Sequence, residues 1–295
     1  MKTELSILIP IYNACCTPLV EQLYHQAGAL RGFRFEIIVA EDGSTLEGPI
    51  AANDAITALP NCQHIIRGEN VGRAAIRNFL AQQARYEWLL FIDGDMSIIN
   101  NDFLTDYLRT DGSQVVYGGY RVGEGERSNL RYRYEKASEP YHTSEQRQTK
   151  PYRDFHTSNF LIHRDVMLAH PFDERFRRYG YEDVLFGKHL RQAGISILHI
   201  DNPVGFNSFE DNRTFVEKTE EGLRTLHDFR DDLRGYNGLL TFVGGIHVPL
   251  VKWFLRICHR LFGPLLRRQL CGRWPSLFVF KLYKLGYYLT LTKND

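Results

Sequence analysis

The chain lacks most of the features that mark secreted, membrane-spanning or zinc-binding proteins. Its five cysteines are an odd number and none has C-x-x-C spacing, which argues against a disulfide framework or a zinc site and fits a reducing cytoplasm. No apolar run reaches the roughly 20 residues that a helix needs to cross a bilayer. The first apolar stretch, residues 5–11, is too short for the core of a signal peptide. We therefore expect a cytoplasmic protein.

Net charge is also small, only +1 over 295 residues, and so it predicts no partner by itself. The charge is unevenly distributed, because residues 236–295 hold nine Lys/Arg and one Asp, a net charge of +8, which leaves −7 for residues 1–235. With 43% hydrophobic and 24% charged residues, the composition is that of a globular protein. We predict one domain over 1–235 and a helical, basic and aromatic extension over 236–295.

Strand and helix patterns alternate over the first hundred residues. Short apolar runs predict strands over 5–11, 35–40, 63–66 and 87–92. Helical segments lie between them, over 18–30, from after Ser44 to about Leu59, and over 72–84. This order is typical of βαβ units, so we predict an α/β fold with a mostly parallel sheet flanked by helices.

The second half of the chain is less regular. Apolar runs predict further strands over 115–120, 157–162 and 195–200. Helical spacing is found over 182–194 and 214–234. Residues 123–154 are polar and charged, and we expect them to form an irregular or partly helical, mobile excursion over the active face.

Polar side chains follow three of the predicted strands at the points where they end. Parallel sheets bind ligands beyond the carboxyl ends of their strands, so residues 10–13, 41–44 and 93–95 are expected to line one crevice. In Asp93-Gly94-Asp95, two carboxylates at this spacing suit Mg²⁺ or Mn²⁺ with phosphate oxygens as further ligands. The same string is also typical of a turn. The string alone leaves both interpretations open.

Two other motifs in the first half also have a structural and a functional interpretation. Asp42, before Gly43-Ser44, either forms a turn or accepts hydrogen bonds from a base or ribose. The segment that begins at Asn70 also has two interpretations. In one, Asn70 caps the following helix and the side chains of Arg73 and Arg77 are in solvent. In the other, the two arginines lie on one face of the helix near a diphosphate.

Three positions in the second half are candidates for chemistry. Glu182 and Asp183 begin a helix, where the helix dipole favours acids, or one of them is a general base. His156 and Asn159 either begin a strand as polar residues or recognise a substrate hydroxyl. His199 lies in an apolar stretch, and a buried histidine is favoured over a metal ligand.

Taken in order along the chain, these motifs resemble those of glycosyltransferase family 2, the inverting family with the GT-A fold. The resemblance is carried by 6–13 (Ser-Ile-Leu-Ile-Pro-Ile-Tyr-Asn), 42–44, 70–78, 91–95, and 182–183 with 190–194 (Leu-Arg-Gln-Ala-Gly). It covers residues 4–235. Each motif alone is common, but the ordered set is specific.

The resemblance implies a role for each motif on the donor side. Pro10, Tyr12 and Asp42 would hold the nucleotide base, usually uracil in this family. Asn70 and Arg73 would lie beside the donor nucleotide.

The remaining motifs would supply the metal and the acceptor side. Asp95 would bind Mg²⁺ or Mn²⁺ directly, and Asp93, next to Gly94, would contact the ribose and metal-bound water. Asp183 would deprotonate the acceptor hydroxyl and Glu182 would help to orient it. The acceptor or donor-sugar side would be lined by two residues, His156 and Asn159.

The chain departs from the family pattern in two places. Glu41 stands where many members carry a first Asp, and Gly205-Phe206 stand where related bacterial sequences often have Tyr-His, which leaves the third protein contact of the metal unassigned.

The function that the resemblance implies is a metal-dependent, inverting transfer of a sugar from a nucleotide-sugar donor, a UDP-sugar. The acceptor would be a hydroxyl of a glycan or lipid-linked molecule in envelope polysaccharide synthesis. One alternative is a catalytically silent nucleotide-sugar-binding or scaffold protein of the same fold, which Phe206 favours. A sugar-1-phosphate nucleotidyltransferase would need a Gly-rich basic loop after the first strand, where residues 10–15 instead read Pro-Ile-Tyr-Asn-Ala-Cys.

The extension has its own pattern. Residues 240–295 mix aromatic and aliphatic residues with Lys and Arg, and 251–262 has the spacing of a basic amphipathic helix. One interpretation is a helical subdomain that packs on the body. The other is an in-plane helix on an anionic leaflet, which would place the protein peripherally at the inner face of the cell membrane. No nucleic-acid partner is expected, because no recognition motif accompanies the charge.

Overall fold

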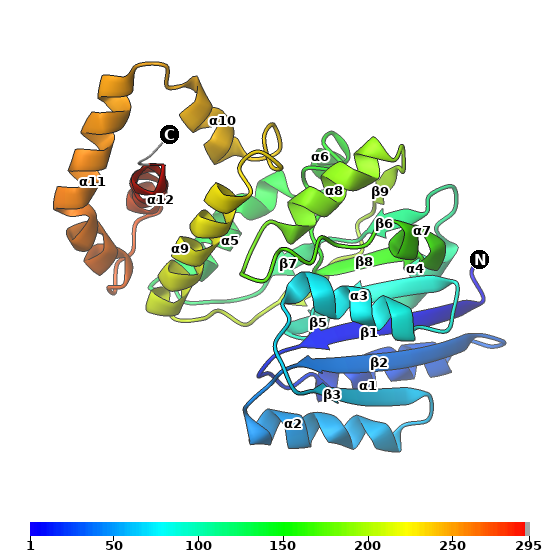
Figure 1. The fold of residues 1–295 in the computed structure, drawn as a ribbon. Helices are drawn as coiled ribbons and strands as arrows, with labels where there is room; N and C mark the ends of the chain where they lie inside the picture. Colours follow the sequence, from blue (N-terminus) through cyan, green and yellow to red (C-terminus); the bar gives the residue numbers. More distant parts are fainter. Residues whose placement is uncertain (293–295) are drawn as a thin grey trace. The chain divides into compact units, whose positions relative to one another are not determined.

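The computed structural model describes residues 1–292 and divides into two compact units. The first unit consists of Met1–Gly123, Pro140–Arg177 and Glu182–Ser208. The second consists of Glu124–Glu139, Arg178–Tyr181 and the chain from Phe209 onward. Figure 1 shows the elements of both units.

The core of the first unit is a mostly parallel sheet, as predicted. Within residues 1–292 this sheet has seven strands in the order β3-β2-β1-β4-β8-β6-β9. Their bounds are β1 (Glu4–Ile11), β2 (Arg34–Asp42), β3 (Cys62–Arg67), β4 (Trp88–Ile92), β6 (Val115–Tyr117), β8 (Asn159–His163) and β9 (Ile197–His199). Strand β1 runs parallel to β2 and β4, and β8 runs antiparallel to β4 and β6. The carboxyl ends of β1, β2 and β4 therefore lie at one edge.

A second, small sheet was not predicted. It pairs three short strands in the order β5-β10-β7, with bounds β5 (Met96–Ile98), β10 (Val204–Phe206) and β7 (Tyr120–Val122). The single strand predicted over 115–120 is wrong, because the chain leaves the large sheet at Gly118-Gly119 and enters the small one. A Cβ on Gly118 would lie 2.3 Å from the Asn202 carbonyl oxygen, and Gly119 has φ +88°. Only glycines fit this crossing point.

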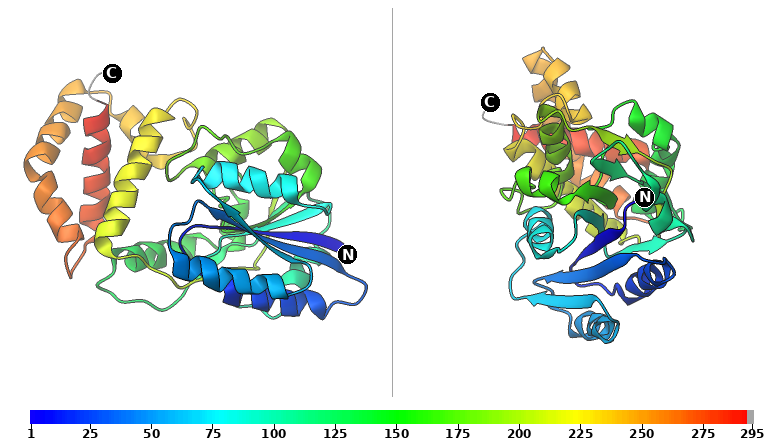
Figure 2. Two further views of the ribbon diagram at one scale, coloured as in Figure 1. Left: turned by 60° about the horizontal axis from the view of Figure 1, so that its bottom comes forward. Right: turned by 90° about the vertical axis from the view of Figure 1, so that its right-hand side faces the viewer.

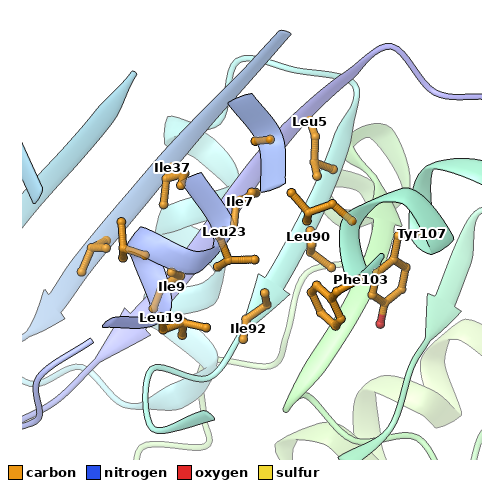
Figure 3. Packing of buried hydrophobic residues seen from close by; sticks show 14 of the residues in the cluster. Leu5, Ile7, Ile9, Leu19, Leu23, Ile37, Leu90, Ile92, Phe103 and Tyr107 are labelled. Atoms are coloured by element: carbon orange, nitrogen blue, oxygen red, sulfur yellow. The ribbon is translucent and has the colours of Figure 1, made fainter. Parts of the chain in front are cut away.

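Helices cover both faces of the large sheet (Figures 1 and 2). On one face, alternate residues of β1 pack against α1 (Thr17–Gly28) and α4 (Phe103–Arg109), as the side chains of Ile7, Leu23 and Phe103 illustrate in Figure 3. The other face carries α3 (Arg73–Gln83) and a group of aromatic rings in which Phe91 stacks on Phe160 at 4.9 Å. The unit also contains α2 (Glu47–Asp54), the 3₁₀ helix η1 (Ala55–Ala58), α6 (Ser144–Gln148), α7 (Arg164–Ala169) and α8 (Glu182–Gln192).

The predicted excursion over 123–154 is partly helical, with α5 (Leu130–Ser138) in the second unit, the 3₁₀ helix η2 (Glu139–Tyr141) and α6. Its α6 end is fixed to the sheet rather than loose. The buried Arg147 side chain donates to the carbonyl oxygens of Gly118 (3.1 Å) and Ile200 (2.8 Å) and to Nδ1 of His199 (3.2 Å). A buried arginine with these partners pins the segment.

The second unit is helical. Besides α5 it contains α9 (Asn212–Asp228), α10 (Gly238–Gly245), α11 (Pro249–Leu270) and α12 (Leu277–Leu291). Phe215 and Val216 of α9 pack with Leu270, Phe280 and Tyr283 in one buried cluster. Residues 209–235 therefore belong to this compact unit, whereas the sequence predicts the domain boundary at 235/236. No helix within residues 1–292 combines the length and the apolar character needed to cross a membrane.

Candidate active site

The loops that follow β1 and β2 are held together by Asn13. This residue has φ +52°, a conformation that Asn tolerates better than most residues. Its side-chain oxygen accepts hydrogen bonds from the backbone N–H groups of Thr45 (2.7 Å) and Leu46 (3.0 Å), and its own N–H donates to Ser44 Oγ (2.8 Å). The adjacent Tyr12 is left 53% exposed at the end of β1, where a ring could stack on a base.

Glu41 is completely buried beneath these loops. Its carboxylate accepts hydrogen bonds from Asn53 Nδ2 (2.8 Å) and Ser44 Oγ, and it lies 3.2 Å from His64 Nε2. Asn53 in turn accepts from the Cys16 N–H (2.8 Å), which ties α2 to the start of α1. Sequence reasoning missed Asn53 and His64, since each occupies an ordinary position in a helix or a strand. The Glu at position 41 therefore supports the loops from below.

Asp42 is 5% exposed and supports the next loop. Its two oxygens accept from the backbone N–H groups of Val71 (2.9 Å) and Gly72 (3.0 Å). Burial raises the pKa of the Asp42 carboxyl, and these two hydrogen bonds lower it only in part. Asn70 is exposed and does not cap the helix. The capping position is Gly72, with φ +92° and no side-chain hydrogen bond, so that alternative for Asn70 is wrong.

Four charged side chains meet where α3, α8 and the turn after β4 come together. Arg73 donates from Nε to Glu182 Oε1 (2.9 Å) and from Nη2 to Asp93 Oδ2 (2.9 Å). Arg77 donates to the other oxygen of Asp93 (2.5 Å) and lies 3.7 Å from Glu182. We call these four residues the ion-pair cluster. The spacing of Arg73 and Arg77 does put them on one face, as expected.

Exposure separates the two arginines of the ion-pair cluster. The Arg77 side chain is only 1% exposed and the Arg73 side chain is 43% exposed. Within residues 1–292, the buried Nε of Arg77 has no hydrogen-bond partner. Burial raises the pKa of the Glu182 carboxyl, an effect that the Arg73 charge opposes. Arg73 is therefore the arginine that a ligand can reach.

Asp93-Gly94-Asp95 forms a turn between β4 and β5. The Asp93 N–H donates to the Ser158 carbonyl (3.0 Å), and the Met96 N–H donates back to the Asp93 carbonyl (3.1 Å). A Cβ on Gly94 would lie 2.3 Å from Ile11 Cδ1 and 3.3 Å from the Pro10 carbonyl, so only glycine allows this close approach to β1. The turn directs the Asp93 side chain to the ion-pair cluster and leaves Asp95 exposed.

The residues present fit a divalent cation that is bound mainly through a substrate. The described part of the chain contains no group of three His, Cys, Asp or Glu side chains that could hold a metal ion by itself. Both oxygens of Asp93 already face arginines, whereas Asp95 is exposed. Phe206 pairs with Met96 across β10 and β5 and is 5% exposed, so this position of the adjacent strand supplies no metal ligand. One carboxylate with diphosphate oxygens and water is a common Mg²⁺ site.

Asp183 lies at the start of α8 beside His156. Its Oδ2 is 3.0 Å from His156 Nδ1, and its Oδ1 accepts from the Val184 N–H (2.8 Å). Burial alone would raise the pKa of the Asp183 carboxyl, but the hydrogen bond and charge of His156, helped by Val184 and Arg73, lower it. The carboxylate is therefore ionised at neutral pH.

The other two polar residues of this region have structural roles. Asn159 is 0% exposed, and its amide group donates to the carbonyl oxygens of Gly119 (2.7 Å) and Asn202 (3.1 Å). Asn159 therefore holds the point where the chain crosses from the large sheet to the small one, and it has no exposed surface that could contact a sugar. His199 is buried and hydrogen-bonded at both ring nitrogens, to Arg147 and to the Pro151 carbonyl (2.9 Å), and burial lowers its pKa to about 4. The interpretation of His199 as a buried histidine is confirmed.

Comparison with known structures shows the fold. TarS of S. aureus, residues 1–349 in complex with UDP, superimposes with a TM-score of 0.54 at 15% identity and covers 98% of this chain and 90% of its own. The mannosyltransferase PcManGT from Pyrobaculum calidifontis, in complex with GDP-Man and Mn²⁺, gives 0.60 at 14% identity, with 98% and 86% covered. The predicted α/β fold of the GT-A type is confirmed.

Comparison of sequences shows the family. EpsH of Bacillus subtilis (strain 168), a protein assigned to the glycosyltransferases, is 32% identical over 112 residues, which span 37% of this chain and 31% of EpsH. Residues 6–169, more than half of the chain, match the family described as Glycosyl transferase family 2. The chain therefore belongs to glycosyltransferase family 2.

Proposed function

We propose that the protein transfers a sugar from a nucleotide-sugar donor, a UDP-sugar, to a hydroxyl of a glycan or lipid-linked acceptor in envelope polysaccharide synthesis. The observation that carries this proposal is the ion-pair cluster. Arg73 contacts both Asp93, on the donor turn, and Glu182, beside the acceptor-side Asp183, at 2.9 Å each. Donor and acceptor groups of the family pattern therefore share one charged centre at the carboxyl edge of the sheet.

The residues of the chain divide the work of such a transfer. Tyr12 would cover one side of the base, and the loops held by Asn13 and Asp42 would form the floor of the donor site. Arg73, with 43% of its side chain exposed, would exchange part of its ion pairing with Asp93 for the diphosphate. Arg77 would remain buried and keep Asp93 in place.

Asp95 would hold Mg²⁺ or Mn²⁺, as its exposure at the turn allows. A cation at this position would supply positive charge to the diphosphate as the leaving group becomes more negative. On the other side of the site, Asp183 would drive the loss of the acceptor proton, and Glu182 would orient this region through Arg73. A single displacement would invert the anomeric centre.

A panel of donors tests the proposal. The purified protein is incubated with Mn²⁺ and, in turn, UDP-GlcNAc, UDP-glucose, UDP-galactose and GDP-mannose, and release of nucleoside diphosphate is measured. We expect release from at least one donor and none from the Asp183→Asn variant. Metal-dependent UDP binding without release from any donor would instead favour the silent, nucleotide-binding alternative that Phe206 suggests. Neither binding nor release would contradict both.

We further propose that the second unit attaches the protein to the cytoplasmic face of the cell membrane. Five large apolar residues lie on one side of α11 at helical spacing and are exposed: Leu250 (69%), Trp253 (55%), Phe254 (58%), Leu261 (67%) and Leu265 (61%). We call them the α11 stripe. Exposed Arg260 and Arg268 lie within the same helix, and residues 236–295 carry a net charge of +8. An apolar stripe with basic neighbours matches an anionic bilayer surface.

Vesicle binding tests this part. We expect the protein to sediment with vesicles of phosphatidylglycerol and phosphatidylcholine, and to do so more weakly with pure phosphatidylcholine or at high salt. The double variant Trp253→Ser/Phe254→Ser should lose most of this binding. Ile66→Ser is a matched control, because Ile66 is 57% exposed but lies in β3 of the first unit. Equal sedimentation of the double variant and the wild type would contradict membrane attachment through α11.

A further inference from the structure

His64 of β3 is a buried histidine that the proposed transfer does not use. Its side chain is 0% exposed, and each of its ring nitrogens faces a carboxylate. Nε2 lies 3.2 Å from Oε1 of Glu41, and Nδ1 lies 3.4 Å from Oδ1 of Asp54, the last residue of α2. Val39 pairs with His64 across β2 and β3, so the side chains of His64 and Glu41 project from the same face of the sheet.

The two carboxylates favour one protonation state of the His64 ring. An ionised carboxylate only accepts hydrogen bonds, and a neutral imidazole has a single N–H donor. A neutral ring would therefore turn a lone pair toward one of the two acids, whereas the imidazolium donates from both nitrogens. Within residues 1–292, the contact with His64 is also the one ion pair that Glu41 makes. The arrangement therefore suits a positively charged His64 that balances the charge of Glu41.

This positive charge matters because Glu41, which is completely buried, holds the loops of the donor site. The Glu41 carboxylate receives hydrogen bonds from Ser44 Oγ and from Asn53 Nδ2 (2.8 Å). Ser44 Oγ in turn accepts from the Asn13 N–H (2.8 Å). Asn53 Nδ2 also donates to the Ala14 carbonyl oxygen (2.9 Å). The loops after β1 and β2 are therefore both tied to one buried anion, and such an anion is costly without a cation beside it.

We infer that His64 is a positioning residue for the donor, because its charge stabilises the Glu41 carboxylate that fixes the loop next to Tyr12. The inference rests on the proposed transfer from a nucleotide-sugar and adds a residue to its donor site. Tyr12 directly precedes Asn13 and is 53% exposed, so the position of its ring depends on the loop that Glu41 holds. His64 is completely enclosed and touches neither nucleotide nor sugar. Loss of its charge should therefore weaken nucleotide binding and leave the transfer step unchanged.

The affinity for nucleotide tests the role of His64. Isothermal titration calorimetry measures UDP binding in the presence of Mn²⁺, and release of nucleoside diphosphate from the donor that the panel identifies gives KM and kcat. His64→Leu leaves the buried Glu41 without a cation, so the Kd for UDP and the donor KM should both rise about 10–100-fold. The kcat at saturating donor should stay at the wild-type level, because the ion-pair cluster is not changed. His64→Gln, which keeps an N–H donor without the charge, should show a smaller loss of affinity.

A double variant separates the charge of His64 from its packing. In His64→Leu/Glu41→Gln the buried anion is gone, and the new amide can still accept from Asn53 Nδ2 and donate to Ser44 Oγ. Replacing both partners of a buried pair costs much less than removing one of them. We therefore expect the double variant to recover most of the lost UDP affinity, which a role of His64 in packing alone would not allow. Circular dichroism at the assay temperature shows that each variant is folded.

His163→Leu is the matched control. His163 also lies in the large sheet and pairs with a glutamate, Glu87 at 2.8 Å, but it does so beside the amino end of β4. This variant should bind UDP as the wild type does. Wild-type affinity in the folded His64 variants, or equally weak binding by His64→Leu and the double variant, would overturn the inference and leave the proposed function standing. A wild type that neither binds UDP nor releases nucleoside diphosphate from any donor would overturn the proposed function itself.

Discussion

The two compact units differ in how far their large apolar side chains are exposed. In the first unit, the strands of the large sheet bury Ile7, Leu90 and Phe160 completely. In the second, a small cluster around Phe215 and Phe280 is buried, but Trp253 and Trp274 remain 55% and 80% exposed. Large exposed apolar areas on a protein surface mark places that bind something else. The comparison suggests that one unit carries the chemistry and the other carries an attachment surface.

The largest expected effect tests whether chemistry is confined to the first unit. Asp183→Asn should reduce kcat by about 10²–10⁴-fold, because the amide cannot take the proton that Asp183 would remove from the acceptor hydroxyl. Mn²⁺-dependent UDP binding and vesicle sedimentation should both stay at wild-type levels. A variant that turns over normally would remove Asp183 from the mechanism. Loss of vesicle binding would show that the two units are not functionally separate.

The second prediction compares a buried phenylalanine of the first unit with an exposed one of the second unit. Phe160 is 0% exposed and stacked on Phe91, so Phe160→Ala should lower the free energy of unfolding by about 3–5 kcal/mol. Phe254 is 58% exposed, so Phe254→Ala should change it by less than about 0.5 kcal/mol. Urea denaturation followed by circular dichroism measures both. Equal losses would mean that the α11 stripe is covered in the free protein.

The third prediction is a pH dependence of the free energy of unfolding, caused by the buried His199 of the first unit. Burial, with the charges of Arg147 and His156, lowers the pKa of His199 to about 4. Between an unfolded value of about 6.5 and this folded value, the unfolded state binds the proton and the folded state does not. Stability should therefore fall as the pH is lowered, by about 2 kcal/mol from pH 7 to pH 5.

The variant His199→Asn checks this pH effect. Whatever its stability at pH 7, it should lose about 2 kcal/mol less than the wild type on acidification to pH 5. His25→Asn is a suitable control, because it makes the same substitution at an exposed histidine. An identical slope in all three proteins would show that His199 titrates normally in the folded state.

The smallest effect concerns the exposed edge of the donor site. Asp95→Ala should weaken UDP binding in the presence of Mn²⁺ by about tenfold, or about 1.4 kcal/mol, and should not change it in EDTA. Isothermal titration calorimetry measures both conditions. Asp102→Ala provides a matched control, since Asp102 is also exposed and makes no capping hydrogen bond. Equal metal dependence in the wild type and Asp95→Ala would place the cation elsewhere.

The elements that the sequence predicted well are those with a strong local cause. The apolar runs at 5–11 and 87–92 became β1 and β4 almost residue for residue, because strands covered on both faces are apolar throughout. The three-residue strands of the small sheet have no such signal. Their pairing depends on Gly118-Gly119 and Gly205, whose missing side chains matter only once distant segments pack against them.

The candidate site shows the same division. The residues of the site could be predicted from the order of the motifs, and in the structure Arg73 forms ion pairs with Asp93 and Glu182. The burial of each of these residues could not be predicted from the sequence, because it depends on which distant parts of the chain pack against that residue. Arg77 and Asn159 look in sequence like surface polar residues, yet they are 1% and 0% exposed. The Glu41–Asn53–His64 contacts join residues of three separate elements.

The sequence by itself determined the family, the parallel sheet and the residues at its carboxyl edge, because motif order and apolar patterning are properties of the chain. The tertiary structure decided how exposed each of these residues is. Asp93 and Asp95 are two positions apart, yet one is paired with buried arginine and the other is exposed. The same holds for Asp183, whose hydrogen bond to His156 joins residues 27 positions apart. Proton transfer and metal binding depend on such distances and on burial, which only packing of the whole unit establishes.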